Sequence, residues 1–269
     1  MSTQAPDPDT DSRQGIQSIE VGVPLLRVLA EQGGPIMLRD LARAADMPAA
    51  KAHRYLVSFM RVGLVAQDPQ SGRYELGSFA LELGLARLAR LDAVRVATPI
   101  LEELNEETGE TVALAVWGNM GPTFVRWIES RRPVSVNLRT GDVMPLLHSA
   151  TGLCFATFLD TPTVRQRVAG EMELVLKSRD PRPPRSQKEF DELTAEARSH
   201  GLTRTQGTVI PSVNGYSAPV FNHDGQMAVA ITSLGPASQF PNAWNSAVAK
   251  AVLSAARRAS AELGWRRER

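Results

Sequence analysis

The segment from Ile36 to Leu76 constrains the fold more than any other part of this sequence. Apolar residues recur at helical spacing over Leu38–Ala45 and again from Ala49 to about Val62, and Asp46-Met47-Pro48 forms a tight turn between the two patterns. Two short strand patterns then flank the turn-rich loop Asp68–Gly72. Helix, turn, helix and β-hairpin in this order predict a winged helix-turn-helix, a shape that inserts one helix into a groove of DNA.

The second helix of this segment, the predicted recognition helix, divides into an apolar stripe and an opposite polar face. Between Met47 and Gln67 the sequence has three basic residues and no acidic one, which favours contact with phosphates. The predicted DNA-binding residues are Lys51, His53, Arg54, Ser58 and Arg61 on the helix and Arg73 on the returning wing strand. For the helix, the alternative is the solvated face that any amphipathic helix has, and the winged context favours DNA binding over it. For Arg73, the alternative is an ordinary surface arginine.

The rest of the chain is long enough for a second domain, since the sequence has 269 residues. Helical periodicity resumes from Phe79 to Thr108 with a break near Asp92, which predicts a linker helix and then the first helix of that domain. The later patterns predict strands at 111–117, 123–129 and 134–139, a short helix over 150–159, strands at 213–221 and 226–234, and a final helix over 241–263. The predicted divisions are a disordered tail (1–14), a winged helix-turn-helix (15–77), a linker helix (78–92) and a second domain (93–269).

Composition narrows the class of protein. The single cysteine, Cys154, excludes an intramolecular disulfide framework and any cysteine-rich zinc module. No apolar run approaches the roughly 20 residues of a membrane span, and the polar first residues lack the apolar core of a signal peptide. A cytoplasmic protein with no membrane partner is therefore expected.

Catalytic, metal and cofactor sites are not predicted. Cys154 and His148 are close in sequence, but Cys154 is surrounded by apolar residues, as a buried and inert cysteine would be. The four histidines are scattered without the spacing of a zinc site, and no glycine-rich phosphate-binding loop is present.

Three stretches carry a resemblance to a known family: LARAADMPAAKAHRYL…GLVAQDPQSGRYELG, RRPVSVNLRTGDVMPLLHSATGLCFATFL and SAPVFNHDGQMAVAITSLGPAS. They resemble the IclR family of bacterial transcription regulators, in the expected order and over nearly the whole chain. The resemblance implies an α+β two-domain fold: an N-terminal winged helix-turn-helix, a linker helix, and a C-terminal α/β, GAF-like effector-binding domain with a curved antiparallel sheet. One departure is Ala49-Ala50, where members often have a hydroxyl or basic residue, so contacts should concentrate on Lys51, His53 and Arg54.

The resemblance also implies an effector pocket. Its predicted residues are Leu147, Ser149, Thr151, Gly152, Phe155, Asn214, Gly215, Tyr216, Thr232, Ser233 and Leu234. The N-terminus of the short helix near 150–152 offers N–H groups to a carboxylate. Many relatives have a residue with a small thiol or hydroxyl at the position of Gly215, and a serine is common at the position of Leu234. The glycine and the leucine imply a roomier, more apolar pocket, which suits an aromatic or otherwise bulky organic acid. Further apolar walls are expected from Trp117, Trp127, Met144, Phe155 and Tyr216, for which a place in the core is the alternative.

The predicted function is sequence-specific transcription regulation, in which a small organic acid alters affinity for DNA. One recognition helix covers only a few base pairs, so a palindromic operator in double-stranded DNA and a homodimer, or a dimer of dimers, are expected. Leu81, Leu85 and Leu88 supply either a dimer surface or part of the intramolecular core. The alternatives are a small-acid-processing enzyme with an accessory DNA-binding head, and a DNA-binding protein that has no ligand.

Overall fold

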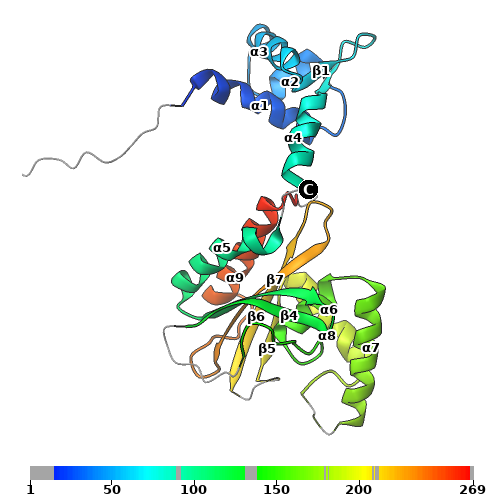
Figure 1. Cartoon of the computed structure of the whole chain (residues 1–269), viewed down its shortest axis with the longest axis vertical. Coiled ribbons are helices and arrows are strands. Elements are labelled where there is room, and N and C mark those ends of the chain that lie inside the picture. The colour runs from blue at the N-terminus through cyan, green and yellow to red at the C-terminus, as the bar shows by residue number, and fades with distance from the viewer. Residues whose placement is uncertain are drawn as a thin grey trace, which may run out of the picture. The chain divides into compact units, whose positions relative to one another are not determined.

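The computed structural model describes residues 15–88, 92–130, 138–178, 180, 182–207, 209 and 212–266. Residue contacts divide the chain into two compact units, residues 1–90 and 91–269, which Figure 1 draws in blue to cyan and in green to red. The predicted disordered tail, 1–14, lies outside the described residues.

The first unit is a small helical domain with a hairpin. In chain order it contains α1 (Gln17–Glu31), α2 (Leu38–Ala44), α3 (Ala49–Arg61), β1 (Val65–Gln67), β2 (Tyr74–Leu76) and α4 (Ser78–Leu88). Its core is formed where the apolar stripes of α1, α2 and α3 meet, with Leu25, Leu41 and Leu56 fully buried. The predicted helix-turn-helix and wing are present at nearly the predicted residues.

Two local features fix the geometry of this unit. Between α2 and α3, Asp46 adopts a left-handed backbone conformation with φ of 49°, and the N–H of Met47 donates to Ala42 O at 2.9 Å. At the wing, Ile36 and Tyr74 exchange two main-chain hydrogen bonds of 3.0 and 2.8 Å. The segment before α2 therefore lies beside the hairpin, and the wing is tied to the helices.

The second unit is a five-stranded sheet with helices on both faces. Its elements are α5 (Ala93–Thr108), β3 (Thr111–Gly118), β4 (Gly121–Ile128), α6 (Ala150–Phe158), α7 (Pro162–Lys177), α8 (Gln187–His200), β5 (Thr203–Gln206), β6 (Val213–Phe221), β7 (Met227–Pro236) and α9 (Ala247–Glu262). The strand order is β4-β3-β7-β6-β5, antiparallel throughout. Helices α5 and α9 cover one face, and α6, α7 and α8 lie on the other (Figure 1).

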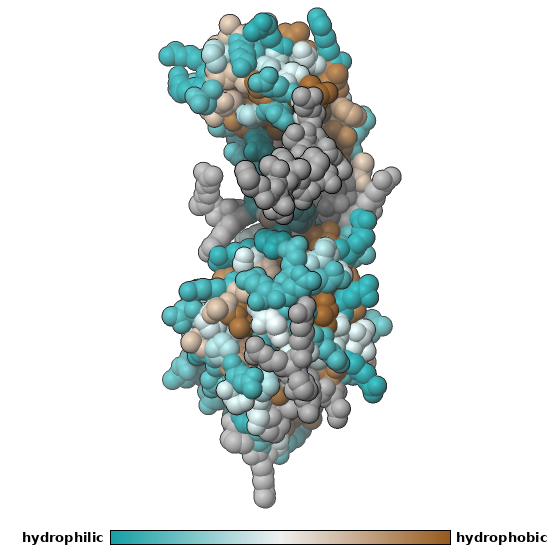
Figure 2. Space-filling model, turned by 90° about the vertical axis from the view of Figure 1, so that its left-hand side faces the viewer, coloured by the Kyte–Doolittle hydropathy of each residue, from teal (hydrophilic) through white to brown (hydrophobic). Residues whose placement is uncertain are grey.

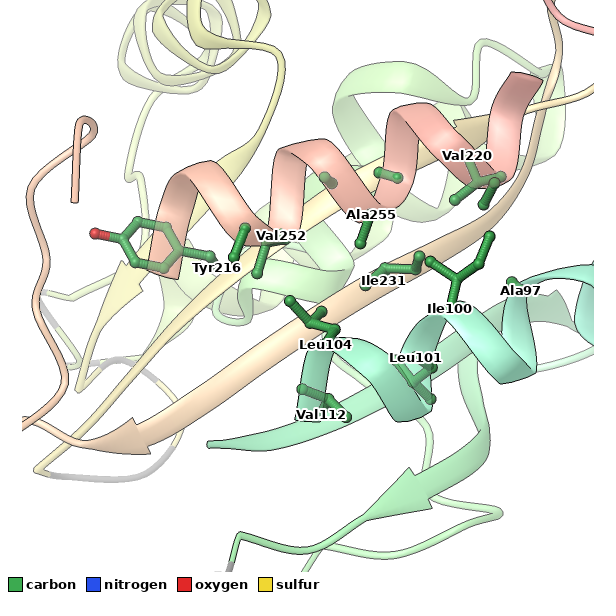
Figure 3. Close-up of a cluster of buried hydrophobic side chains, with 14 of the residues drawn as sticks. Ala97, Ile100, Leu101, Leu104, Val112, Tyr216, Val220, Ile231, Val252 and Ala255 are labelled. Carbon is green, nitrogen blue, oxygen red and sulfur yellow. The ribbon is translucent and has the colours of Figure 1, made fainter. Parts of the chain in front are cut away.

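Alternation along the strands gives the two faces different side chains. Figure 3 shows Leu101 and Leu104 of α5 and Val252 of α9 pointing toward the sheet, where Ile231 of β7 lies. The other face of the central strands has small residues, with Ala113, Ala115 and Ala230 fully buried. Small side chains let a helix approach the backbone closely, and α6 occupies this face.

The fold class predicted from sequence is confirmed, but three details differ. α7 and the edge strand β5 were not predicted; β5 reads TRTQ, which carries no strand-like alternation of apolar residues. The final helix begins at Ala247 and not at Pro241, because Ser246 caps it by accepting a hydrogen bond from the Ala249 N–H. The predicted strand at 134–139 falls outside the described residues up to 137, and Leu138 and Arg139 are not in a strand.

The first turn of α6 lies unusually close to the chain that precedes it. A Cβ atom built on Gly152 would lie 1.9 Å from Pro145 O and 2.7 Å from the Cα of Leu146. Both neighbours are backbone, so neither can rotate out of the way. Only glycine allows α6 to start at this position.

We therefore expect Gly152→Ala to lower the free energy of unfolding by about 3 kcal/mol or more, because the backbone must separate. The matched control is Gly170→Ala on α7, where a Cβ would meet nothing within 4 Å; it should add up to about 1 kcal/mol through helix propensity. Urea unfolding followed by tryptophan fluorescence reports on this unit, since Trp117, Trp127, Trp244 and Trp265 all lie in it. Equal effects of the two substitutions would contradict the steric explanation.

Candidate DNA-binding surface and ligand pocket

The recognition helix α3 presents a continuous polar arc to solvent. Ala52 and Leu56 are buried, whereas Arg54, Ser58 and Arg61 are exposed and Lys51 is half-buried. At about 100° per residue, Lys51, Arg54, Ser58 and Arg61 span less than a quarter of the helix circumference. His53 is exposed as well but lies outside this arc, about 80° further round the helix from Arg61.

The basic side chains of this arc are not engaged within the described part of the chain. No carboxylate there forms an ion pair with Lys51, Arg54 or Arg61, and α3 has no acidic residue in its first turn. Ser58 donates its hydroxyl hydrogen to Arg54 O at 3.2 Å, a bond that a helix-surface serine exchanges easily. Positive charge is therefore available on one side of the helix.

Arg73 has a different setting. Its Nη1 donates to Pro35 O at 3.3 Å, across the segment that pairs with the wing. The guanidinium thus ties the wing to the loop before α2, although its side chain remains exposed.

The wing turn is organised by Asp68. Its carboxylate accepts hydrogen bonds from the N–H groups of Gln70 and Ser71 and from the Ser71 hydroxyl. The Ser71 hydroxyl is the largest of the causes that hold the pKa of Asp68 below its usual range. The carboxylate therefore stays charged and keeps the turn closed at neutral pH.

In the second unit, a narrow cavity lies between α6 and the α6-facing side of the sheet. It has a volume of about 40 Å³. Apolar residues and short hydroxyl residues share the lining, which consists of Phe124, Leu138, Met144, Ser149, Ala150, Thr151, Thr205, Val209, Val213, Asn214, Gly215, Thr232 and Leu234. No charged side chain of the described residues belongs to this lining.

A chain of hydroxyl groups forms one wall of the cavity. The hydroxyls of Thr151 and Thr232 lie 2.8 Å apart, and Thr232 donates to Ser217 Oγ at 2.9 Å. Ser149 caps α6 by accepting from the Gly152 N–H at 2.8 Å. The N–H groups of Ala150 and Thr151 in the first helical turn have no intrahelical partner.

Both units match one family. Residues 85–261 match the family described as Bacterial transcriptional regulator IclR C-terminal, and residues 18–69 match the IclR helix-turn-helix domain. The chain belongs to the IclR family of bacterial transcriptional regulators. It is therefore a DNA-binding transcription regulator, as the winged helix-turn-helix predicted.

Individual relatives agree with this assignment. The crystal structure of Pseudomonas aeruginosa HmgR is similar at 38% sequence identity and a TM-score of 0.82, covering 93% of this chain and 99% of HmgR. HTH-type transcriptional regulator BhcR of Paracoccus denitrificans is 27% identical over 257 residues, 94% of this chain and 90% of BhcR. An IclR homologue from Microbacterium hydrocarbonoxydans, solved with 4-hydroxybenzoate, has 22% identity and a TM-score of 0.53, covering 91% of this chain and 98% of that one. At that identity the likeness shows the fold alone.

The structure brings together about half of the effector residues expected from the IclR resemblance. Ser149, Thr151, Asn214, Gly215, Thr232 and Leu234 line the cavity. Leu147 and Phe155 are packed in the hydrophobic core around α6, and Gly152 lies against Pro145 O. Of the expected apolar walls, Met144 lines the cavity, whereas Trp117 and Trp127 pack against that same core.

Two further expected residues, Tyr216 and Ser233, lie on the opposite face of the sheet. They are paired across β6 and β7, and Figure 3 shows Tyr216 at the end of the cluster beneath α9. Burial raises the pKa of the Tyr216 phenol, whose hydroxyl donates to Ala243 O at 2.7 Å. The side chain of Asn214 donates to Phe240 O, so it too is engaged away from α6.

Besides Met144, which was expected as an apolar wall, four lining residues lie outside the three segments from which the pocket was expected, 146–155, 212–217 and 232–234: Phe124, Leu138, Thr205 and Val209. Phe124 lies on β4, which is separated from β6 by two other strands, so only the strand order reveals it. Thr205 belongs to the unpredicted strand β5, opposite Gly215. A correct prediction of β5 from sequence would have found Thr205.

The setting of Cys154 is that of a core residue. The thiol is fully buried on α6, and burial raises its pKa, so it stays protonated. The nearby His148 places Nδ1 3.1 Å from Glu171 Oε1. Among the described residues, no group of three His, Cys, Asp or Glu side chains gathers to hold a metal, and no helix is long and apolar enough to cross a membrane.

Proposed function

We propose that this regulator reads a palindromic operator through α3, as a homodimer or a dimer of dimers, and that a bulky, preferably aromatic, organic acid controls its operator affinity. The observation that carries the proposal is the cavity beneath α6, whose lining combines apolar side chains with residues of the first turn of that helix. The proposed domains are the DNA-binding winged helix-turn-helix (15–77), the linker helix (78–92) and the effector-binding domain (93–269). A cytoplasmic location follows from the proposed partner, DNA.

The proposed DNA contacts are the exposed residues of α3. Lys51, Arg54 and Arg61 supply phosphate contacts, and His53 and Ser58 supply contacts to base edges or to the backbone. Because Arg73 donates to Pro35 O, its proposed role is to hold the wing near the DNA backbone rather than to read bases.

Exposed leucines on α4 support self-association. Leu81 and Leu85 are 64% and 55% exposed, and Leu83 beside them is 51% exposed. Within the described residues these side chains therefore do not seal the core, which leaves a dimer surface as the proposed role. On the face of the molecule that Figure 2 shows, apolar residues, in brown, are scattered among hydrophilic ones.

The chemistry of the cavity favours an apolar acid over a very small one. The hydroxyls of Thr151 and Thr232 are already bonded to each other and to Ser217, so the N–H groups of Ala150 and Thr151 are the remaining donors for a carboxylate. Among the described residues, no arginine or lysine of the lining adds an ion pair. Most of the affinity must then come from burying apolar surface, at about 25 cal/mol per Å².

The cavity is also smaller than such a ligand. Its 40 Å³ compares with the roughly 150 Å³ of a protein cavity that holds benzene. At Gly215 a Cβ would already be in van der Waals contact with Ser233 O, Leu234 Cβ and Ala150 Cβ, at 3.4 to 3.7 Å. To admit the proposed ligand, the walls must move apart. A ligand that fits only the opened state shifts the population toward that state, which is what regulation requires.

The two alternatives make distinct demands on the chain. A small-acid-processing enzyme would need an activated nucleophile, and the protonated, buried Cys154 does not offer one. A DNA-binding protein without a ligand predicts no thermal shift with any acid. We therefore favour a regulator that is not an enzyme and carries no cofactor.

Arg54→Ala should weaken binding to DNA from upstream of the protein's own gene by roughly tenfold, because one phosphate is no longer neutralised. The slope of log affinity against log salt concentration should also become shallower by about one. The matched control is Arg257→Ala on α9, which removes the same charge from an exposed site in the other unit. Fluorescence anisotropy at several salt concentrations measures both quantities. If the two variants bound DNA with the same affinity and the same salt dependence, α3 would not be the recognition helix.

Gly215→Val should weaken ligand binding and leave the affinity for DNA unchanged, because its γ carbons would occupy the cavity beside Ala150 and Leu234. Calorimetry on the wild type should show 4-hydroxybenzoate binding at least about a hundredfold more tightly than acetate. The valine variant should lose at least about tenfold in affinity for 4-hydroxybenzoate. Thr205→Val is the control, since it lines the cavity and keeps its volume. Equal affinity of the wild type for 4-hydroxybenzoate and acetate would contradict the proposed ligand class.

A further inference from the structure

One carboxylate outside the cavity holds the segment from which α6 begins. Glu171, on α7, accepts hydrogen bonds from the Leu146 N–H at 2.8 Å and the Leu147 N–H at 3.0 Å, one on each carboxylate oxygen. Its Oε1 also lies 3.1 Å from His148 Nδ1. The Glu171 side chain is 20% exposed, so the carboxylate is largely withdrawn from water.

These bonds satisfy main-chain groups that have little access to water. Leu146 and Leu147 are 4% and 1% exposed. A buried N–H group without an acceptor is costly, and an acceptor that carries charge makes the stronger bond. Two carboxylate oxygens facing two consecutive N–H groups also restrict the direction of the segment, which a single acceptor would not do.

The same segment sets the polar end of the cavity. Pro145 O accepts from the Ser149 hydroxyl at 2.8 Å and packs against Gly152 in the first turn of α6. Ser149, Ala150 and Thr151 follow directly and line the cavity. A displacement of residues 145–148 would therefore move the N–H groups that face the proposed ligand.

Glu171 itself does not belong to the lining of that cavity. It faces a separate, open groove of about 1040 Å³, together with His148 and residues of α7. The carboxylate therefore lies on the opposite side of residues 146–148 from the ligand.

We propose that Glu171 is a positioning residue for the ligand pocket: from outside the cavity, it holds residues 146–148 so that the first turn of α6 can receive a carboxylate. This rests on the proposed function, since it concerns the same pocket. The residue adds no contact to the ligand. It acts through the main chain of Leu146 and Leu147, and its removal should weaken ligand binding while DNA binding in the absence of ligand is unchanged.

The test compares Glu171→Gln with Glu173→Gln in the full chain. Glu173 is exposed on the same helix and forms no side-chain hydrogen bond or ion pair within the described residues, so its variant loses the same charge without such a bond. Calorimetry with 4-hydroxybenzoate gives the ligand affinity, amide hydrogen exchange gives the protection of Leu146 and Leu147, and anisotropy gives the DNA affinity without ligand.

Glu171→Gln should weaken 4-hydroxybenzoate binding by roughly ten- to a hundredfold and speed exchange at both amides by at least about tenfold, with DNA affinity unchanged. Glu173→Gln should match the wild type in all three measurements. If the glutamine variant does not fold, Glu171→Asp takes its place. The same result is expected, because the shorter side chain holds its carboxylate oxygens one methylene further from the N–H groups of Leu146 and Leu147.

Wild-type affinity for 4-hydroxybenzoate in the Glu171 variant, or unchanged protection of the two amides, would overturn the inference. A wild-type protein that does not bind 4-hydroxybenzoate would instead overturn the proposed ligand class, and the inference with it. The two failures are therefore distinguishable.

Discussion

The hydrogen-bonded contact between the first turn of α6 and the sheet is the interaction on which the ligand-binding unit depends. Thr151 reaches Thr232 and through it Ser217, while Thr203 donates to Ala150 O at 2.7 Å. Small residues on this face let the helix approach, and the hydroxyls then fix where it lies. A buried hydroxyl without a partner costs about 1–3 kcal/mol, so one position of α6 is favoured over its neighbours. The cavity lies between that position of α6 and the strands that carry Gly215 and Thr232.

The recognition helix could be predicted from sequence because its signal is local. The faces of α3 follow from helical periodicity, and the turn before it from Asp46 and Pro48. The pocket could be predicted only in part. Strand β6 is buried along nearly its whole length, so no alternation of polar and apolar residues shows that Gly215 and Tyr216 face opposite sides. Its other wall comes from strands and loops that only the tertiary fold places together.

A cavity too small for its proposed ligand is informative about mechanism. A ligand changes an equilibrium between two states only if it binds one of them more tightly. Here the cavity of about 40 Å³ is smaller than the roughly 150 Å³ of one that holds benzene, so the proposed ligand requires the walls around Met144 and Leu234 to move apart. Under the proposed function, ligand binding selects a different arrangement of the residues around α6, and regulation requires that the two arrangements also differ in DNA affinity.

The most direct test of that central claim is the affinity for 4-hydroxybenzoate measured by calorimetry with and without saturating operator DNA. Thermodynamic linkage requires the acid and the operator to change each other's dissociation constant by the same factor, which for coupled sites is typically about 5- to 150-fold. We expect saturating operator DNA to change the Kd for the acid, and the acid to change the Kd for the operator, by the same factor. An acid that binds with the same Kd in both cases would show that the pocket does not control the reading of DNA.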